Sequence, residues 1–125
     1  MRRCPCRYGL EPNYGCCTAN FNQGWPKFAH ALLFTDAAGG VVVGAWAPVS
    51  AALDGGVAVD VETDYPFGDV ATVTVKAAKA VPVSLRIPSW AHRATVDGRP
   101  APNGTMWRGV AAAGGGSFVV DFAPE

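Results

Sequence analysis

Apolar residues alternate with polar or small residues along most of the chain. Val57, Val59 and Val61 occupy every second position of one segment, and the same period of two returns in residues 70–76 and 81–87. A period of two places one face of a β-strand in a core and the other face outside it. The predicted strands are Val41–Trp46, Ser50–Leu53, Val57–Thr63, Val70–Lys76, Val81–Ile87, Ala94–Val96 and Ser117–Phe122.

Turn residues separate these segments at short intervals. Glycine supplies positive φ and proline a fixed φ, so clusters of the two predict tight turns between strands. Seven short strands at this spacing favour an antiparallel β-sandwich, and thus a mainly β fold. The turn clusters are Gly39-Gly40, Asp54-Gly55-Gly56, Pro66–Asp69, Asp97-Gly98 and Gly114–Gly116.

One segment before the strands has a helical period instead. Between Thr18 and Phe34, apolar residues recur at spacings of four, three and four, as on one face of a helix. Pro26 is unfavourable inside a helix, so we expect either a break at Gly24-Trp25 or a helix that starts there with Pro26 in its first turn. The apolar stripe consists of Phe21, Trp25, Phe28 and Leu32.

Composition and charge exclude several classes of protein. The 125 residues, half of them hydrophobic, suffice for one domain with a core. Ten basic residues balance ten acidic ones without a basic stripe, so nucleic-acid binding is not expected. No apolar run is long enough to span a membrane, and the N-terminus lacks the apolar region of a signal peptide. The compartment stays unknown, because a longer parent protein could carry its own targeting segment.

The four cysteines all lie within the first 17 residues. Cys16 and Cys17 are adjacent, and a disulfide between neighbours would strain the peptide bond. They are better suited to bind a metal, or to form a reactive thiolate beside one, than to form a disulfide. The interpretation that they are only two small buried residues is equally good. Cys4 and Cys6 could complete a four-thiolate zinc site with them, or could lie in a frayed terminus.

Several motifs resemble one known family, and they occur in that family's order. The residues from Gly9 to Phe28 resemble the segment that closes the catalytic barrel of glycoside hydrolase family 127, the β-L-arabinofuranosidase-like proteins. Later motifs resemble the middle β-sandwich of the same proteins and the hairpin that follows it. These later motifs are Glu62–Asp69, Leu85–Ala91, Val96–Gly98 and Asn103–Phe122.

The resemblance implies a division of the chain and a role for the cysteine pair. Residues 1–34 would be the end of the catalytic helical barrel, and residues 35–125 the middle sandwich. Cys16 would be the nucleophile that attacks the anomeric carbon to give a thioglycosyl intermediate. Cys16 and Cys17 would both bind zinc, which would keep Cys16 a thiolate. The full-length parent would act on arabinose-containing glycans.

The chain also departs from the family pattern. The family's catalytic acid and remaining zinc ligands belong to earlier parts of the barrel, and Glu11 does not match that acid. Thr18-Ala19 stands where many members carry two prolines, which leaves the sugar specificity open. We therefore expect this chain alone to be an inactive fragment of a glycosidase. The helical stripe, without its barrel, is expected to cause self-association.

Other candidate sites have two interpretations each. Trp25, Trp46, Trp90 and Trp107 could stack on sugar rings, but Trp46 and Trp90 are better explained by packing. The segment Asp64–Asp69 is acidic enough for calcium, but its proline and glycine favour a turn. His30 and His92 have no nearby ligand pattern. Besides a glycosidase fragment, the alternatives are a non-catalytic carbohydrate-binding or interaction module and a small structural zinc protein.

Overall fold

The computed structural model describes residues 20–122. These residues fall into two units, a helical one that ends at His30 and a β unit that begins at Ala31. The predicted domain boundary between residues 34 and 35 stays a prediction.

The helical unit contains a 3-10 turn, η1 (Phe21–Gln23), and one short helix, α2 (Gly24–His30). Pro26 lies in the first turn of α2, where its missing N–H costs nothing because that donor would have no partner within the helix. The second of the two predicted arrangements is therefore the one observed. The helix is shorter than the stripe suggested, since it ends at His30.

Leu33 and Phe34 belong to a strand, not to the predicted helix. They form β1 (Leu33–Thr35), which pairs antiparallel with β2 (Val41–Val43). The Asp36 carboxylate closes the hairpin by accepting from the N–H groups of Ala38 and Gly40, at 2.8 and 2.7 Å. The prediction that the helical segment extends to Phe34 was thus wrong, because strand pairing with β2 outweighs the local spacing of apolar residues.

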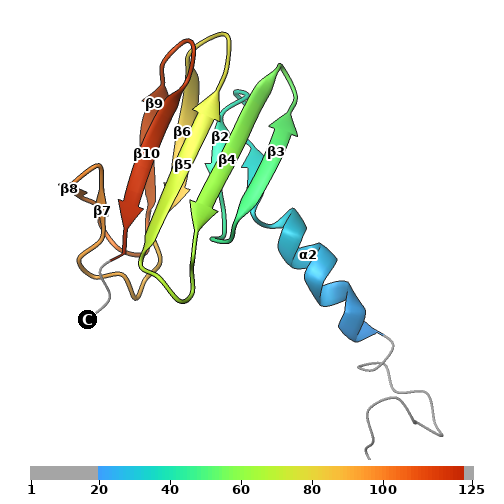
Figure 1. The fold of residues 1–125 in the computed structure, drawn as a ribbon, viewed down its shortest axis with the longest axis vertical. Helices are drawn as coiled ribbons and strands as arrows, with labels where there is room; N and C mark the ends of the chain where they lie inside the picture. The colour runs from blue at the N-terminus through green and yellow to red at the C-terminus, as the bar shows by residue number, and fades with distance from the viewer. Residues whose placement is uncertain (1–19, 123–125) are drawn as a thin grey trace, which may run out of the picture. The chain divides into compact units, whose positions relative to one another are not determined.

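The β unit is a two-layer sandwich (Figure 1). Its four-stranded sheet has the order β1-β2-β6-β9, and its six-stranded sheet the order β3-β4-β5-β10-β7-β8. All neighbours are antiparallel except β2 and β6, which are parallel. The remaining strands are β3 (Val49–Leu53), β4 (Val57–Thr63), β5 (Val70–Lys76), β6 (Val81–Arg86), β7 (Thr95–Val96), β8 (Arg99–Pro100), β9 (Met106–Ala111) and β10 (Gly116–Asp121).

The core lies between the two sheets. Valines at alternate positions of β4 and β5 are buried, and so are Val83 and Leu85 on β6 of the facing sheet. The intervening polar side chains of each strand are at least partly exposed. This alternation confirms the predicted mainly β fold with a sandwich preceded by one short helical segment.

Strand boundaries follow the predictions closely where the alternation is strict. The observed β4 and β5 have the predicted bounds, whereas the strand predicted over Val41–Trp46 ends at Val43. β9 was not among the strands predicted from alternation, because its side chains are mostly exposed or half-buried and Gly109 interrupts the pattern, although the resemblance implied a hairpin within Asn103–Phe122. Gly109 is required there, since a Cβ atom at this position would overlap the Trp107 ring.

Candidate functional site

The predicted catalytic and metal residues lie outside the described part of the chain. Cys16 and Cys17 precede residue 20, as do Cys4, Cys6 and Glu11. The nucleophile and the zinc ligands therefore stay predictions. Within residues 20–122, no three His, Cys, Asp or Glu side chains are grouped closely enough to hold a metal ion.

One end of the sandwich gathers the loops that carry two of the resemblance motifs. The 64–69 loop joins β4 to β5, and the 87–94 loop leads from β6 to β7. Pairing of Asp121 with both Val70 and Thr95 places the start of β5, the start of β7 and the end of β10 together. Residues distant in sequence therefore meet at this end.

An aromatic cluster fills this end around Phe122. The ring of Phe122 lies 5.1 Å from Trp46, 5.8 Å from Tyr65 and 5.7 Å from Trp90, measured between centroids. Tyr65 and Trp90 stack almost in parallel, with centroids 6.0 Å apart and planes 9° apart. Edge and offset contacts of this kind add stability beyond burial of the rings.

The tryptophans divide between packing and exposure. Trp46 is 5% exposed, and its indole N–H donates to the carbonyl of Arg86 at 2.8 Å. Trp46 therefore packs the core, as expected, and cannot offer a face to a sugar. Trp107 is half-buried against Phe118, with ring centroids 5.5 Å apart. Trp90 is 39% exposed and combines packing with an accessible surface.

The 64–69 loop has the hydrogen bonds of a turn. The N–H groups of Phe67 and Gly68 both donate to the carbonyl of Asp64, at 2.8 and 3.2 Å. The hydroxyl of Thr63 donates across the loop to the carbonyl of Val70 at 2.8 Å. These bonds support the turn interpretation over calcium binding. They leave Phe67 at the loop surface, 96% exposed.

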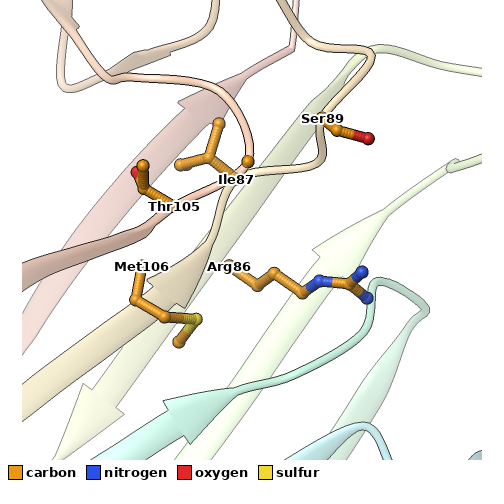
Figure 2. Close-up of a pocket in the computed structure, with 6 residues that line it drawn as sticks. Arg86, Ile87, Ser89, Thr105 and Met106 are labelled. Carbon is orange, nitrogen blue, oxygen red and sulfur yellow. The ribbon is translucent and has the colours of Figure 1, made fainter.

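A cleft of about 340 Å³ lies beside the end of β6 and the start of β9, and residues of the 87–94 loop contribute to its lining (Figure 2). In this view the Arg86 and Ser89 side chains extend to one side of the strand, and Thr105 and Met106 lie on the other. Arg86 makes one long hydrogen bond, 3.4 Å, to the carbonyl of Gly44. Arg86 is the one charged group in the lining, so the cleft has no pair of carboxyl groups for acid–base cleavage of a glycosidic bond.

A second, open hollow of about 660 Å³ runs beside β3 and β4. It is lined by three acidic residues, Asp60, Glu62 and Asp64, together with neighbouring polar and apolar positions. Asp60 accepts a hydrogen bond from the Ser50 hydroxyl on the adjacent strand. Glu62 and Asp64 are exposed, so the hollow does not enclose a substrate.

The two histidines lack a carboxylate partner among the contacts of residues 20–122. His92 is exposed, and its Nδ1 lies 3.1 Å from the amide nitrogen of Asn103, which also donates to the carbonyl of Ser89 at 2.7 Å. His30 lies in the last turn of α2. A base needs a partner that orients it toward a reacting proton, and neither histidine has a carboxylate bonded to it in the described contacts.

No described helix is long and apolar enough to cross a membrane. Of the predicted apolar stripe, Phe21, Trp25 and Phe28 are exposed in the helical unit, whereas Leu32 is buried in the β unit, so its place in the stripe was wrong. Trp25 is 75% exposed, and it lies edge-on to Phe28 at 6.4 Å beside an apolar hollow of about 290 Å³.

Similar solved structures include members of one glycosidase family. A β-L-arabinofuranosidase of family 127 from Geobacillus stearothermophilus T6 has a TM-score of 0.64 and 22% identity, over 85% of this chain and 19% of its own. A protein described as a glycoside hydrolase has a TM-score of 0.67 and 23% identity, over 85% of this chain and 20% of its own. A family 127 β-arabinofuranosidase has a TM-score of 0.60 and 15% identity, over 85% of this chain and 21% of its own.

The chain spans about one fifth of the length of these structures. At such identities the likeness shows a shared fold. No curated protein matches the chain. The family model described as "Beta-L-arabinofuranosidase, GH127 middle domain" matches residues 40–111, a range that includes the 64–69 loop and Trp90. The chain therefore belongs to the middle-domain family of the family 127 β-L-arabinofuranosidases.

Proposed function

We propose that this chain is part of a glycosidase that acts on arabinose-containing glycans. The observation that carries the proposal is the middle-domain match over residues 40–111. The similar solved structures are several times longer than this chain and are described as glycosidases. A middle domain in such a protein accompanies a catalytic part.

The β unit then has a structural role. Its described clefts contain no pair of enclosed carboxyl groups, and its largest aromatic residues are used in packing. Hydrolysis with an oxocarbenium-like transition state needs an acid to protonate the leaving oxygen. This chain by itself is accordingly inactive, and activity requires the remainder of the enzyme.

The cysteine pair would supply the nucleophile. As the family resemblance implies, Cys16 would attack the anomeric carbon and displace the glycosidic oxygen, which a carboxylic acid from the rest of the barrel would protonate, and Cys16 and Cys17 would hold zinc. A bound zinc ion lowers the pKa of a ligating thiol, so that the thiolate is available at neutral pH. This assignment rests on the Gly15-Cys16-Cys17 motif.

An antibody against the β unit tests the proposal directly. In extracts of the source cells it should detect a polypeptide several times longer than 125 residues. The immunopurified polypeptide should release the aryl group from an aryl β-L-arabinofuranoside, whereas the 125-residue chain should not. A long polypeptide without activity on any arabinofuranoside would contradict the proposed substrate class, and turnover by the short chain would contradict its inactivity.

A second candidate function is non-catalytic carbohydrate binding. The observation that favours it is the partly exposed Trp90 ring, which Tyr65 holds in a fixed orientation from one side. An indole face with restricted motion is a suitable platform for a sugar ring. Trp46 does not contribute, because it is buried.

A further inference from the structure

The four-stranded sheet has one face in the core and one face directed away from it. Alternate residues of β6 are buried, so Ser84 and Arg86 point outward. The strand register continues this outward row across the sheet. Phe34 of β1 lies opposite Val42 of β2, which lies opposite Ser84 of β6. Ser84 in turn lies opposite Arg108 of β9, so the row crosses all four strands.

Large apolar side chains gather on this side of the sheet. Two further cross-strand pairs flank the row and complete what we call the outward face, namely Arg86 with Met106 and Pro82 with Val110. Three apolar side chains of the outward face are accessible: Phe34 is 48% exposed, Met106 40% and Val110 63%. An apolar surface that extends over neighbouring strands is typical of an interaction site.

The charge of the outward face has a single sign. Arg86 and Arg108 lie diagonally across two paired strands, because Arg86 is two residues beyond Ser84, the partner of Arg108. The four strands contain no Asp, Glu or Lys. No carboxylate on these strands therefore neutralises the two arginines.

The opposite face of the sandwich has a different composition. The outward side of the six-stranded sheet carries Asp60, Glu62 and Lys76, with serine, threonine or alanine at most other positions. Interspersed charges of both signs are typical of a surface that stays in water. Surfaces that bind proteins are instead enriched in aromatic residues, methionine and arginine, and depleted of lysine, aspartate and glutamate. The outward face of the four-stranded sheet has this second composition.

We propose that the outward face docks onto the catalytic part of the longer parent enzyme. Apolar side chains of that part cover Phe34, Met106 and Val110, and its carboxylates pair with Arg86 and Arg108. The inference rests on the proposed function, since it requires a longer parent. It adds the surface through which the β unit fulfils its structural role.

The family match and the charge of the face both favour this partner. The chain matches a middle domain and spans about one fifth of the similar structures, so the proposed parent has most of its length outside these residues. A second copy docked face to face would bring Arg86 and Arg108 against the same two arginines, without a carboxylate between them. A mixture of apolar and charged side chains also fits contacts between domains, which are more polar than permanent subunit interfaces.

Arginine labelling tests whether the face is covered. Phenylglyoxal reacts with the 125-residue chain and with the immunopurified long polypeptide, and mass spectrometry gives the rate at each arginine. Arg93 and Arg99 are exposed and lie outside the face, so they serve as controls that react alike in both proteins. The rates at Arg86 and Arg108 should be roughly tenfold or more lower in the long polypeptide, because buried groups react only when the interface opens.

Three labelling results would overturn the proposal. Equal rates at Arg86 and Arg108 in the two proteins would mean that the face stays uncovered. Tenfold protection already present in the dilute 125-residue chain would mean that another segment of the chain covers it. Protection of the 125-residue chain that grows with its concentration would mean that a second copy does.

Cross-linking identifies the partner surface. A carbodiimide joins a lysine amine to a carboxylate in contact with it as an amide, and the reagent leaves as a urea. In the long polypeptide expressed from its gene, Arg108→Lys should cross-link to an Asp or Glu of the catalytic part, and the control Arg99→Lys should not. A cross-link to a segment that follows the β unit overturns the proposal.

The outcome is separable from that of the proposed function. A long polypeptide that cleaves an arabinofuranoside but has fully reactive Arg86 and Arg108 overturns the docking alone. Protected arginines in a polypeptide that cleaves no arabinofuranoside support the docking and contradict the substrate class. The absence of any longer polypeptide overturns both.

Discussion

The rings of Tyr65 and Trp90 stack nearly in parallel, with their centroids 6.0 Å apart. The two residues are 25 positions apart in the sequence, so the stack connects two separate loops. Tyr65 belongs to the turn between β4 and β5, and Trp90 to the connection that follows β6. Phe122, after the last strand, contacts both rings. This contact holds together the end of the sandwich at which the two resemblance motifs meet.

Tyr65→Ala should destabilise the β unit by about 2 kcal/mol. The substitution removes a half-buried ring that packs on Trp90 and Phe122, and a cavity would remain between them. Thermal and urea unfolding measure the change. Phe67→Ala is the matched control in the same loop. Its ring is almost fully exposed, so a change of about 0.5 kcal/mol or less is expected. Similar losses for the two variants would contradict the role of the stack.

Gly109→Ala should destabilise the β unit by about 1–3 kcal/mol, because the added methyl group would overlap the Trp107 ring. Gly116→Ala is the control, since a Cβ there would meet Ala111 at ordinary contact distances of 3.4 and 3.5 Å. Chemical denaturation of the two variants gives the comparison. A neutral Gly109→Ala would show that Trp107 can repack without loss.

Cys16→Ser/Cys17→Ser should lower the amount of zinc bound per chain, because both thiols are the proposed ligands. Cys4→Ser/Cys6→Ser should leave it unchanged. Elemental analysis after removal of excess metal provides the measurement. An equal loss in both double variants would instead indicate a four-thiolate site. If the unsubstituted 125-residue chain bound no zinc, the isolated segment could not hold the metal.

Trp25→Ser/Phe28→Ser should reduce self-association of the chain. The two rings form an exposed apolar surface on α2, and exposed apolar patches promote association. Light scattering over a range of concentrations reports the change in mean mass. As a control, Lys27→Ser alters the same helix without removing an aromatic ring. An unsubstituted 125-residue chain that is strictly monomeric at high concentration would refute the prediction.

Trp90→Ala should abolish any retardation of the chain in affinity electrophoresis through arabinan, if the second candidate function holds. Trp90 is 39% exposed, whereas Trp46 is buried in the core and Trp107 is half-buried against Phe118. Phe67→Ala is again a control for an exposed ring in the neighbouring loop. Unaltered mobility of Trp90→Ala, or no retardation of the parent chain, would remove carbohydrate binding by this ring from consideration.

The sequence by itself determined the class of the fold and the bounds of its central strands. In β4 and β5 every second residue is apolar, and this local alternation suffices because both faces of a strand are specified by its own residues. The motifs around Tyr65 and Trp90 also identified the family, which the match over residues 40–111 confirms.

Only the tertiary structure decided which segments pair and which loops meet. Leu33 and Phe34 lie in the segment predicted to be helical, but pairing with Val43 and Val42 makes them a strand. β9 has little alternation of its own, and its place is set by its register with β6. Neither result can be obtained from local patterns, since the stabilising partners lie far away in the sequence. The burial of Trp46, the stack of Tyr65 on Trp90 and the outward face of the four-stranded sheet depend on the same long-range contacts.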